Sequence, residues 1–170
     1  MSAKLFFLPR LSALMLLLFA ISARSDELTI DGGVLGENQT WDVPGRTYLI
    51  DNLSDPLTVP AGKTLTIGAG VRVASKYNNK STFVVQGALN ASGAAFDLTT
   101  RDGVPQPIIM ESSGQASFTV CDILIDGGGA ASTTTAVFLA RGAAALNLSG
   151  SSVEHATGSL TTVNRAVWSQ

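Results

Sequence analysis

The sequence predicts an all-β domain built as a parallel β-helix, in which short strands stack coil upon coil. Residues 55–73, "DPLTVPAGKTLTIGAGVRV", pack three apolar-polar-apolar pulses into nineteen residues. A strand of three residues is too short for a sandwich core, but it suffices when the equivalent strand of the next coil lies about 4.8 Å away. In the second pulse, Leu65-Thr66-Ile67, the alternation predicts that Leu65 and Ile67 point inward while Thr64 and Thr66 point outward.

A repeat supports the same fold. Two segments align with one gap: "IIMESSGQASFTVCDILIDGGG" (108–129) and "VFLARGAAALNLSGSSVEHATG" (137–158). The offset between them is 29 residues at Ile108 and 28 residues over most of the overlap. This alignment pairs Ile108 with Val137, Gly114 with Gly142, Phe118 with Leu146, Val120 with Leu148, Ile125 with Val153 and Asp126 with Glu154. Repeats of 20 to 50 residues with a strand-turn-strand plan are typical of solenoids.

The chain divides into three parts. Residues 1–25 carry two early cations, an apolar run of eleven residues and small residues before Asp26, a pattern that predicts a secretory signal peptide. Residues 26–56 are expected to form an amino-terminal cap in which Trp41 and Tyr48 cover the first coil. Residues 57–170 are expected to form the coils. Since the closing "AVWSQ" looks like the first strand of another coil, we expect a truncated chain and possible end-to-end association through the open last coil.

Composition limits the classes of function. The chain is 45% hydrophobic and only 14% charged, which favours a folded core and argues against nucleic-acid binding. Removal of residues 1–25 takes away three cations and no acid, which leaves eight cations against thirteen acids and a net charge of −5. The single cysteine, Cys121, excludes an intramolecular disulfide. No later apolar run is long enough for a membrane helix, so no span is expected after signal cleavage.

The stretches "WDVPGRTYLID" (41–51), "LTVPAGKTLTIGAGVRV" (57–73) and "FVVQGALNASG" (83–93) resemble a recurrent opening of secreted bacterial right-handed parallel β-helix proteins of the pectin-lyase-like superfamily. The resemblance implies a right-handed β-helix and export to the cell surface or medium. It is weak for activity, because this fold serves polysaccharide lyases, autotransporter passengers and adhesins alike. The chain has "GAG" where the family pattern often has an acidic residue and Pro before Gly, which affects one turn.

Three acids are the first candidates for chemistry: Asp122, Asp126 and Glu154. The alignment places Asp126 and Glu154 on neighbouring coils about 5 Å apart. Pectate-lyase-like enzymes hold calcium with stacked acids, and polygalacturonase-like relatives use Asp groups for acid-base hydrolysis. The site motifs of those families are absent from this sequence, so we expect solvated acids and predict no catalytic, metal or cofactor-binding residue.

The remaining candidates favour ordinary structural roles. His155 stands beside Glu154 and aligns with Gly127, but no nucleophile accompanies it, and one histidine cannot build a zinc site. Cys121 aligns with Ser149 at a bend, where a small, partly buried residue is expected. The polar turn "KYNNKS" (76–81) is expected to project and to be a place for binding. Asn-x-Ser/Thr patterns, which matter only in a eukaryotic secretory route, occur at Asn38, Asn52, Asn79, Asn90 and Asn147.

A threonine face like that of ice-binding solenoids is a remote alternative, suggested by "STTTA" (132–136) and by Thr58, Thr64 and Thr66. The Thr residues do not recur at one position in every coil.

Two functions follow from these observations. The leading hypothesis is an exported, non-catalytic β-helix that serves as a surface or extracellular binding or structural module, adhesin-like, with glycans or surface proteins as partners. The alternative is a polysaccharide lyase or glycoside hydrolase whose catalytic coils lie beyond residue 170. Acids and an Arg stacked across three successive coils would distinguish the enzyme, and calcium binding by Asp126 and Glu154 would favour it.

Overall fold

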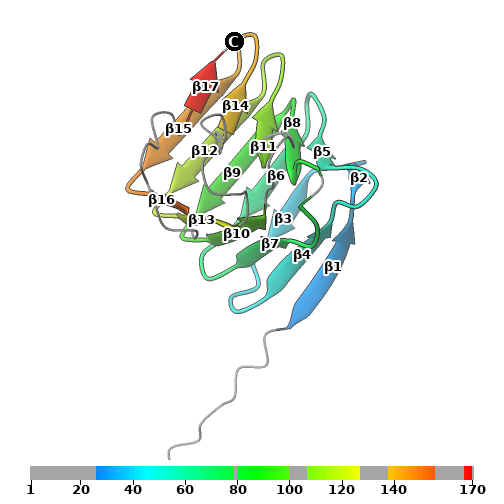
Figure 1. Cartoon of the computed structure of the whole chain (residues 1–170), viewed down its shortest axis with the longest axis vertical. Helices are drawn as coiled ribbons and strands as arrows, with labels where there is room; N and C mark the ends of the chain where they lie inside the picture. Colours follow the sequence, from blue (N-terminus) through cyan, green and yellow to red (C-terminus); the bar gives the residue numbers. More distant parts are fainter. Residues whose placement is uncertain (1–25, 79, 100–106, 127–137, 156–166, 170) are drawn as a thin grey trace, which may run out of the picture.

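The computed structural model of the chain is a parallel β-solenoid with three sheets (Figure 1). It describes residues 26–78, 80–99, 107–126, 138–155 and 167–169. Every paired strand runs parallel to its neighbour, and the described residues contain strands but no helix. The prediction of an all-β parallel solenoid is therefore confirmed.

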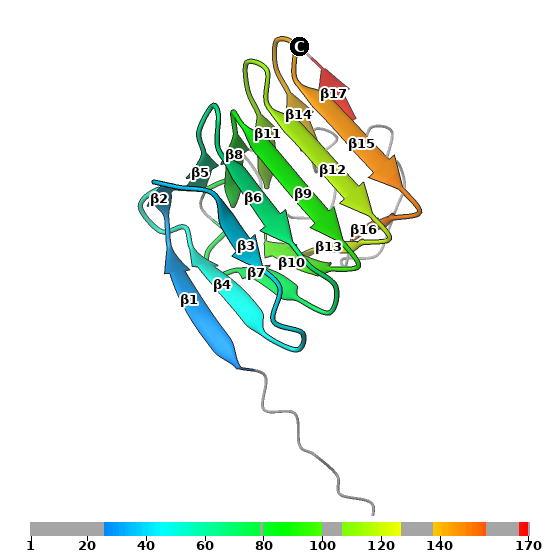
Figure 2. The same ribbon diagram turned by 180° about the vertical axis from the view of Figure 1, so that it is seen from behind.

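Consecutive strands belong in rotation to the three sheets, so each sheet takes every third strand. Sheet A contains β1 (Glu27–Asp31), β4 (Thr47–Asp51), β7 (Arg72–Ser75), β10 (Ala95–Thr99), β13 (Asp122–Asp126) and β16 (Ser152–His155). Sheet B contains β2 (Gly33–Val34), β5 (Leu57–Val59), β8 (Phe83–Val85), β11 (Ile108–Met110), β14 (Phe138–Ala140) and β17 (Val167–Ser169). Sheet C contains β3 (Gln39–Trp41), β6 (Thr64–Ile67), β9 (Ala88–Ser92), β12 (Gln115–Thr119) and β15 (Ala145–Ser149), which Figure 2 shows side by side.

The core forms because side chains alternate between the two faces of each strand. In β6, Leu65 and Ile67 are buried while Thr66 is exposed, as the sequence predicts. Aromatic rings from all three sheets meet inside the later coils. Phe118 lies with its ring centroid 5.3 Å from that of Phe96 and 5.4 Å from that of Phe138.

The predicted register between the last coils is wrong by two residues in sheets A and C and by one residue in sheet B. Phe118 pairs with Leu148, and Ile108 pairs with Phe138, so the offset between these coils is 30 residues in both sheets. The error in sheets A and C has a physical cause: side chains alternate with period two, and a shift of two residues preserves every inward and outward position. The hydrophobic pattern alone therefore cannot distinguish the two registers.

The corner between sheets C and A is built by a column of residues in the left-handed region. It consists of Gly45, Gly70, Gly93, Val120 and Gly150, with φ between 51° and 80°. Backbone bonds connect the column, since the amide of Gly93 donates to the carbonyl of Thr119 at 2.9 Å and that of Val120 donates to Ser149 at 2.8 Å. Val120 is the one member of this column that is not glycine, and its side chain is 67% exposed at the corner.

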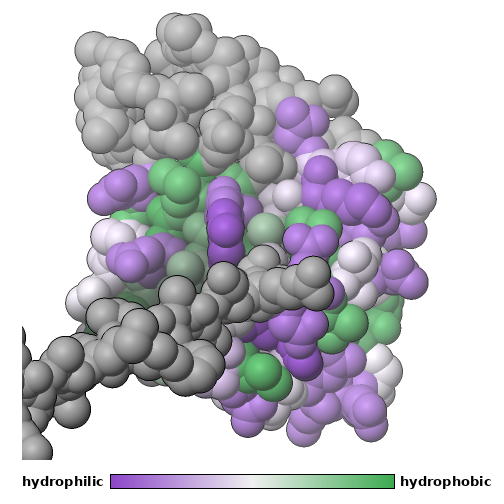
Figure 3. Space-filling view, turned by 90° about the horizontal axis from the view of Figure 1, so that it is seen from below, coloured by the Kyte–Doolittle hydropathy of each residue, from purple (hydrophilic) through white to green (hydrophobic). Residues whose placement is uncertain are grey.

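Residues 26–56 contribute β1 to β4 and extend the same sheets. Trp41 on β3 and Tyr48 on β4 are both buried, and their rings stack with centroids 4.5 Å apart and an interplanar angle of 5°. The pair therefore fills the interior between the first coils. Seen from below, the described surface carries hydrophilic residues over much of its area with separate hydrophobic patches between them (Figure 3).

Candidate binding face

The three sheets turn chemically different faces outward. Among the described strands, those of sheet A carry all of the charged residues: the acids Glu27, Asp31, Asp51, Asp97, Asp122, Asp126 and Glu154 and the cation Arg72. Among the described strands, those of sheets B and C contain no Asp, Glu, Lys or Arg.

The outward positions of sheet B are mainly apolar. Val34, Thr58, Val84, Ile109 and Leu139 follow one another in direct register. Ile109 and Leu139 are buried although they lie outside the cluster that forms the core. Sheet B therefore offers few accessible hydrogen-bonding groups, and sheet C is the side on which polar, uncharged groups gather.

The outer face of sheet C carries a continuous ladder of short polar side chains, which we call the neutral ladder. It consists of Thr40, Thr66, Asn90, Ser117 and Asn147, and each member pairs directly with the next. Four of the five are exposed and Ser117 is half-buried. Because neighbouring strands lie about 4.8 Å apart, the ladder repeats its hydrogen-bonding groups at that interval.

A second, shorter row flanks the neutral ladder. Ser92, Thr119 and Ser149 lie in direct register at the ends of their strands, and all three are exposed. Hydroxyl and carboxamide groups both donate and accept hydrogen bonds, so the two rows present either function at every rung. Within the neutral ladder, Asn147 Nδ2 donates a hydrogen bond to Ser117 Oγ at 3.5 Å. A bond of this length is weak, so a ligand can readily replace it.

Four ion pairs among the described residues lie away from this face. Arg72 pairs with Asp97 and Lys76 with Asp51 on the side of sheet A, and Arg46 pairs with Asp26. Arg141 and Glu111 pair at 3.1 Å at the corner between sheets B and C. Charged residues therefore lie beside sheet C at this corner, whereas its strands contain none.

The acids selected from the sequence do not form the predicted pair. Glu154 pairs with Leu124 and Asp126 pairs with Thr99, so Asp126 and Glu154 are not opposite each other. The predicted pairing was wrong because of the two-residue register error. Asp122 instead accepts a hydrogen bond from Ser152 Oγ at 2.8 Å. The part of the chain that the structure describes contains no group of three or more His, Cys, Asp or Glu residues able to hold a metal ion.

His155 and Cys121 also change partners. His155 pairs with Ile125 in sheet A, and the predicted partner Gly127 lies outside the described residues, as does "STTTA". Cys121 is fully buried rather than partly buried, and it lies opposite Ser151, whose Oγ accepts its backbone N–H at 3.0 Å. The alignment of Cys121 with Ser149 was wrong for the same reason of register. A buried thiol is poorly placed for reaction with solutes.

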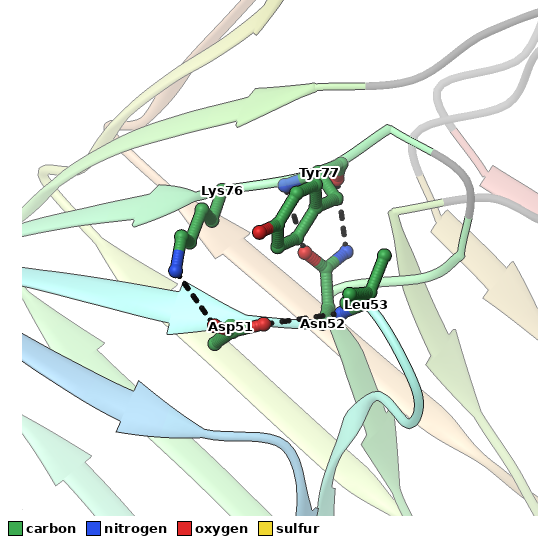
Figure 4. Close-up of polar contacts among 5 residues, drawn as sticks. All are labelled: Asp51, Asn52, Leu53, Lys76 and Tyr77. Atoms are coloured by element: carbon green, nitrogen blue, oxygen red, sulfur yellow. Dashed lines mark hydrogen bonds and ion pairs between the residues drawn. The ribbon is translucent and has the colours of Figure 1, made fainter.

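The turn at 76–81 is tied to the preceding turn rather than projecting freely (Figure 4). The buried Asn52 donates to the carbonyls of Tyr77 at 3.0 Å and Lys80 at 3.1 Å, and it accepts the Tyr77 N–H at 3.0 Å. Lys76 Nζ binds Asp51 Oδ2 at 2.7 Å, which raises the pKa of Lys76 and lowers that of Asp51. With these groups engaged internally, the described part of the turn is a structural clamp.

No family model, curated protein or solved structure significantly matches this chain. Among the described residues, no helix has the length and apolar character needed to cross a membrane. The neutral ladder was not predicted from the sequence, in which the acids and a threonine face were the candidates. The signal was the absence of charge from five consecutive sheet C strands, which becomes visible only after each strand has been assigned to its sheet.

Proposed function

We propose that this chain is an exported, non-catalytic binding module whose neutral ladder binds uncharged polysaccharide. The observation that carries the proposal is the ladder itself, five uncharged polar residues in direct register on a sheet without a charged strand residue. The resemblance to secreted right-handed β-helix proteins of the pectin-lyase-like superfamily and the signal pattern of residues 1–25 favour export, with residues 26–56 acting as a cap.

The chemistry of the face suits a neutral sugar polymer. Sugar hydroxyls donate and accept hydrogen bonds, as do the Thr, Ser and Asn side chains of the ladder. Binding dehydrates both partners, and hydroxyls and amides are much cheaper to dehydrate than ions. A polymer lying across several coils engages several rungs at once, so that individually weak contacts combine into useful affinity.

The test is retention of the purified chain by insoluble neutral polysaccharides, compared with an acidic polysaccharide such as polygalacturonate. Thr66→Lys places a charge at an exposed rung of the neutral ladder, and Thr29→Lys places the same charge at an exposed position of β1 in sheet A. We expect at least tenfold weaker binding for Thr66→Lys, because an unpaired charge at a dehydrated contact costs more than about 1.4 kcal/mol.

Thr29→Lys is expected to bind the neutral polymer like the wild type. Equal losses in the two variants, or retention by the acidic polymer alone, would contradict the proposal. A hydrolytic or eliminating activity of the purified chain would contradict its non-catalytic part.

A further inference from the structure

Val120 is a β-branched residue in a backbone conformation that disfavours it. Its φ of 51° lies in the left-handed region, where four of the five residues of the corner column are glycines. A β-branched residue in that region is a true conformational outlier, because its Cβ approaches the following carbonyl. Strain of this kind persists where another advantage maintains it, and functional surfaces are a common place for it.

The strained residue does not contribute to the protein core. The side chain is 67% exposed, and Val120 is absent from the core cluster whereas its neighbour Cys121 belongs to it. A glycine would satisfy the backbone here, as Gly93 and Gly150 do on the neighbouring coils. The exposed part of the isopropyl group is therefore available for a contact outside the fold.

The position of Val120 joins it to the candidate binding face. It follows Thr119, which is exposed at the end of β12 in the row beside the neutral ladder. The neighbouring coils offer no side chain at this corner, since the equivalent residues are glycines, and a Cβ built on Gly150 would lie 3.6 Å from Val120 Cγ2. Val120 is thus an apolar side chain between two glycines of the corner column, at the edge of a polar face.

We infer that Val120 is a ligand-contacting residue of this face, packing its isopropyl group against the apolar C–H face of a sugar ring whose hydroxyls bind the neutral ladder. The inference rests on the proposed function and deepens it. Polysaccharide rings combine hydroxyls at their rims with C–H groups on their faces, so a polar ladder beside one apolar projection matches both parts. The contact removes apolar surface of both partners from water, which favours binding.

The experiment measures thermal stability and polysaccharide binding on the same variants. Val120→Gly relieves the strain and is expected to raise Tm by about 2–4 °C, while binding to the neutral polymer falls three- to tenfold. Val120→Thr keeps the branched shape and the strain but replaces a methyl group by a hydroxyl, and it is expected to weaken binding without raising Tm. Val34→Gly is the matched control, because Val34 is 70% exposed on sheet B; it is expected to leave binding unchanged.

The outcomes separate the two proposals. If Thr66→Lys loses binding while Val120→Gly and Val120→Thr bind like the wild type, the inference about Val120 is overturned and the proposed function stands. If the wild type binds no neutral polysaccharide, both are overturned. A Val120→Gly variant that is more stable and binds more weakly supports the inference, since a merely structural residue would not change the two quantities in opposite directions.

Discussion

Asn52 provides the sharpest test of how the coils are held together. Its carboxamide is fully buried between two successive turns, where it makes three hydrogen bonds of 3.0 to 3.1 Å with backbone groups of Tyr77 and Lys80. Asn52→Leu keeps a side chain of similar size and removes all three bonds. The backbone groups that lose this partner lie at a partly buried site, so the substitution removes interactions and adds a cost of dehydration.

The magnitude follows from the number of bonds. A hydrogen bond contributes about 1 kcal/mol net, and an unpaired buried group costs about 1–3 kcal/mol, so Asn52→Leu should lower the free energy of unfolding by about 3 kcal/mol. For a domain of this size that corresponds to roughly 6–12 °C in Tm. Urea unfolding followed by circular dichroism measures the change. The control is Asn90→Leu, an exposed Asn of the neutral ladder, which should change stability by less than about 0.5 kcal/mol.

Asn52→Asp sharpens the test further. A carboxylate can still accept the Tyr77 N–H, but it cannot donate to the carbonyls of Tyr77 and Lys80, which lie opposite it. This variant should be less stable than Asn52→Leu at pH 7 and recover part of the loss in acid, where a protonated carboxyl donates one bond. If the free energy of unfolding of Asn52→Leu lies within about 1 kcal/mol of the wild-type value, the hydrogen bonds of Asn52 do not hold the two turns together.

Three further predictions concern packing and charge. Gly114→Ala should lose more than about 3 kcal/mol in urea unfolding, because the added Cβ would lie 2.0 Å from the carbonyl oxygen of Val85; unchanged stability would show that the coils separate easily. Phe118→Ala should lose about 3–5 kcal/mol by the same measurement, since its fully buried ring contacts rings from both other sheets, and a loss below about 1 kcal/mol would contradict the packing. The hydrogen bond from Lys76 lowers the pKa of Asp51, so the ionised carboxylate stabilises the fold above its ordinary pKa, and this contribution disappears as the pH falls through the lowered value. Asp51→Asn should therefore have a lower Tm than the wild type at neutral pH, and the difference should close as the pH falls through the lowered pKa of Asp51, whereas a difference that stays constant into strong acid would contradict the role of the pair.

Much of the fold could be predicted from alternation alone. Leu65 and Ile67 point inward as expected because a period of two assigns each side chain to one face whatever the pairing. The register between coils could not be predicted in the same way, since a shift of two residues leaves the pattern intact. Phe118 was therefore matched to the wrong rung, and Asp126 with Glu154 as well.

The candidate site depended on information that no local pattern contains. The polar turn at 76–81 looked exposed, but Asn52, 25 residues before Tyr77, holds it down. Val120 looked like a strand residue because its neighbours alternate, and only its positive φ reveals a corner. The neutral ladder requires residues from five coils to be placed on one sheet, which needs the correct register first.

The outer face of sheet C is the proposed binding surface. Carbene footprinting of the purified chain, with and without saturating neutral polysaccharide and analysed by tandem mass spectrometry, tests it directly. We expect polysaccharide to reduce the labelling of β6, β9 and β12, including Thr66 and Asn90, and of Val120, while β4, β7 and β10 of sheet A are labelled to the same extent with and without it. Protection of sheet A with unchanged labelling of sheet C would contradict the proposal.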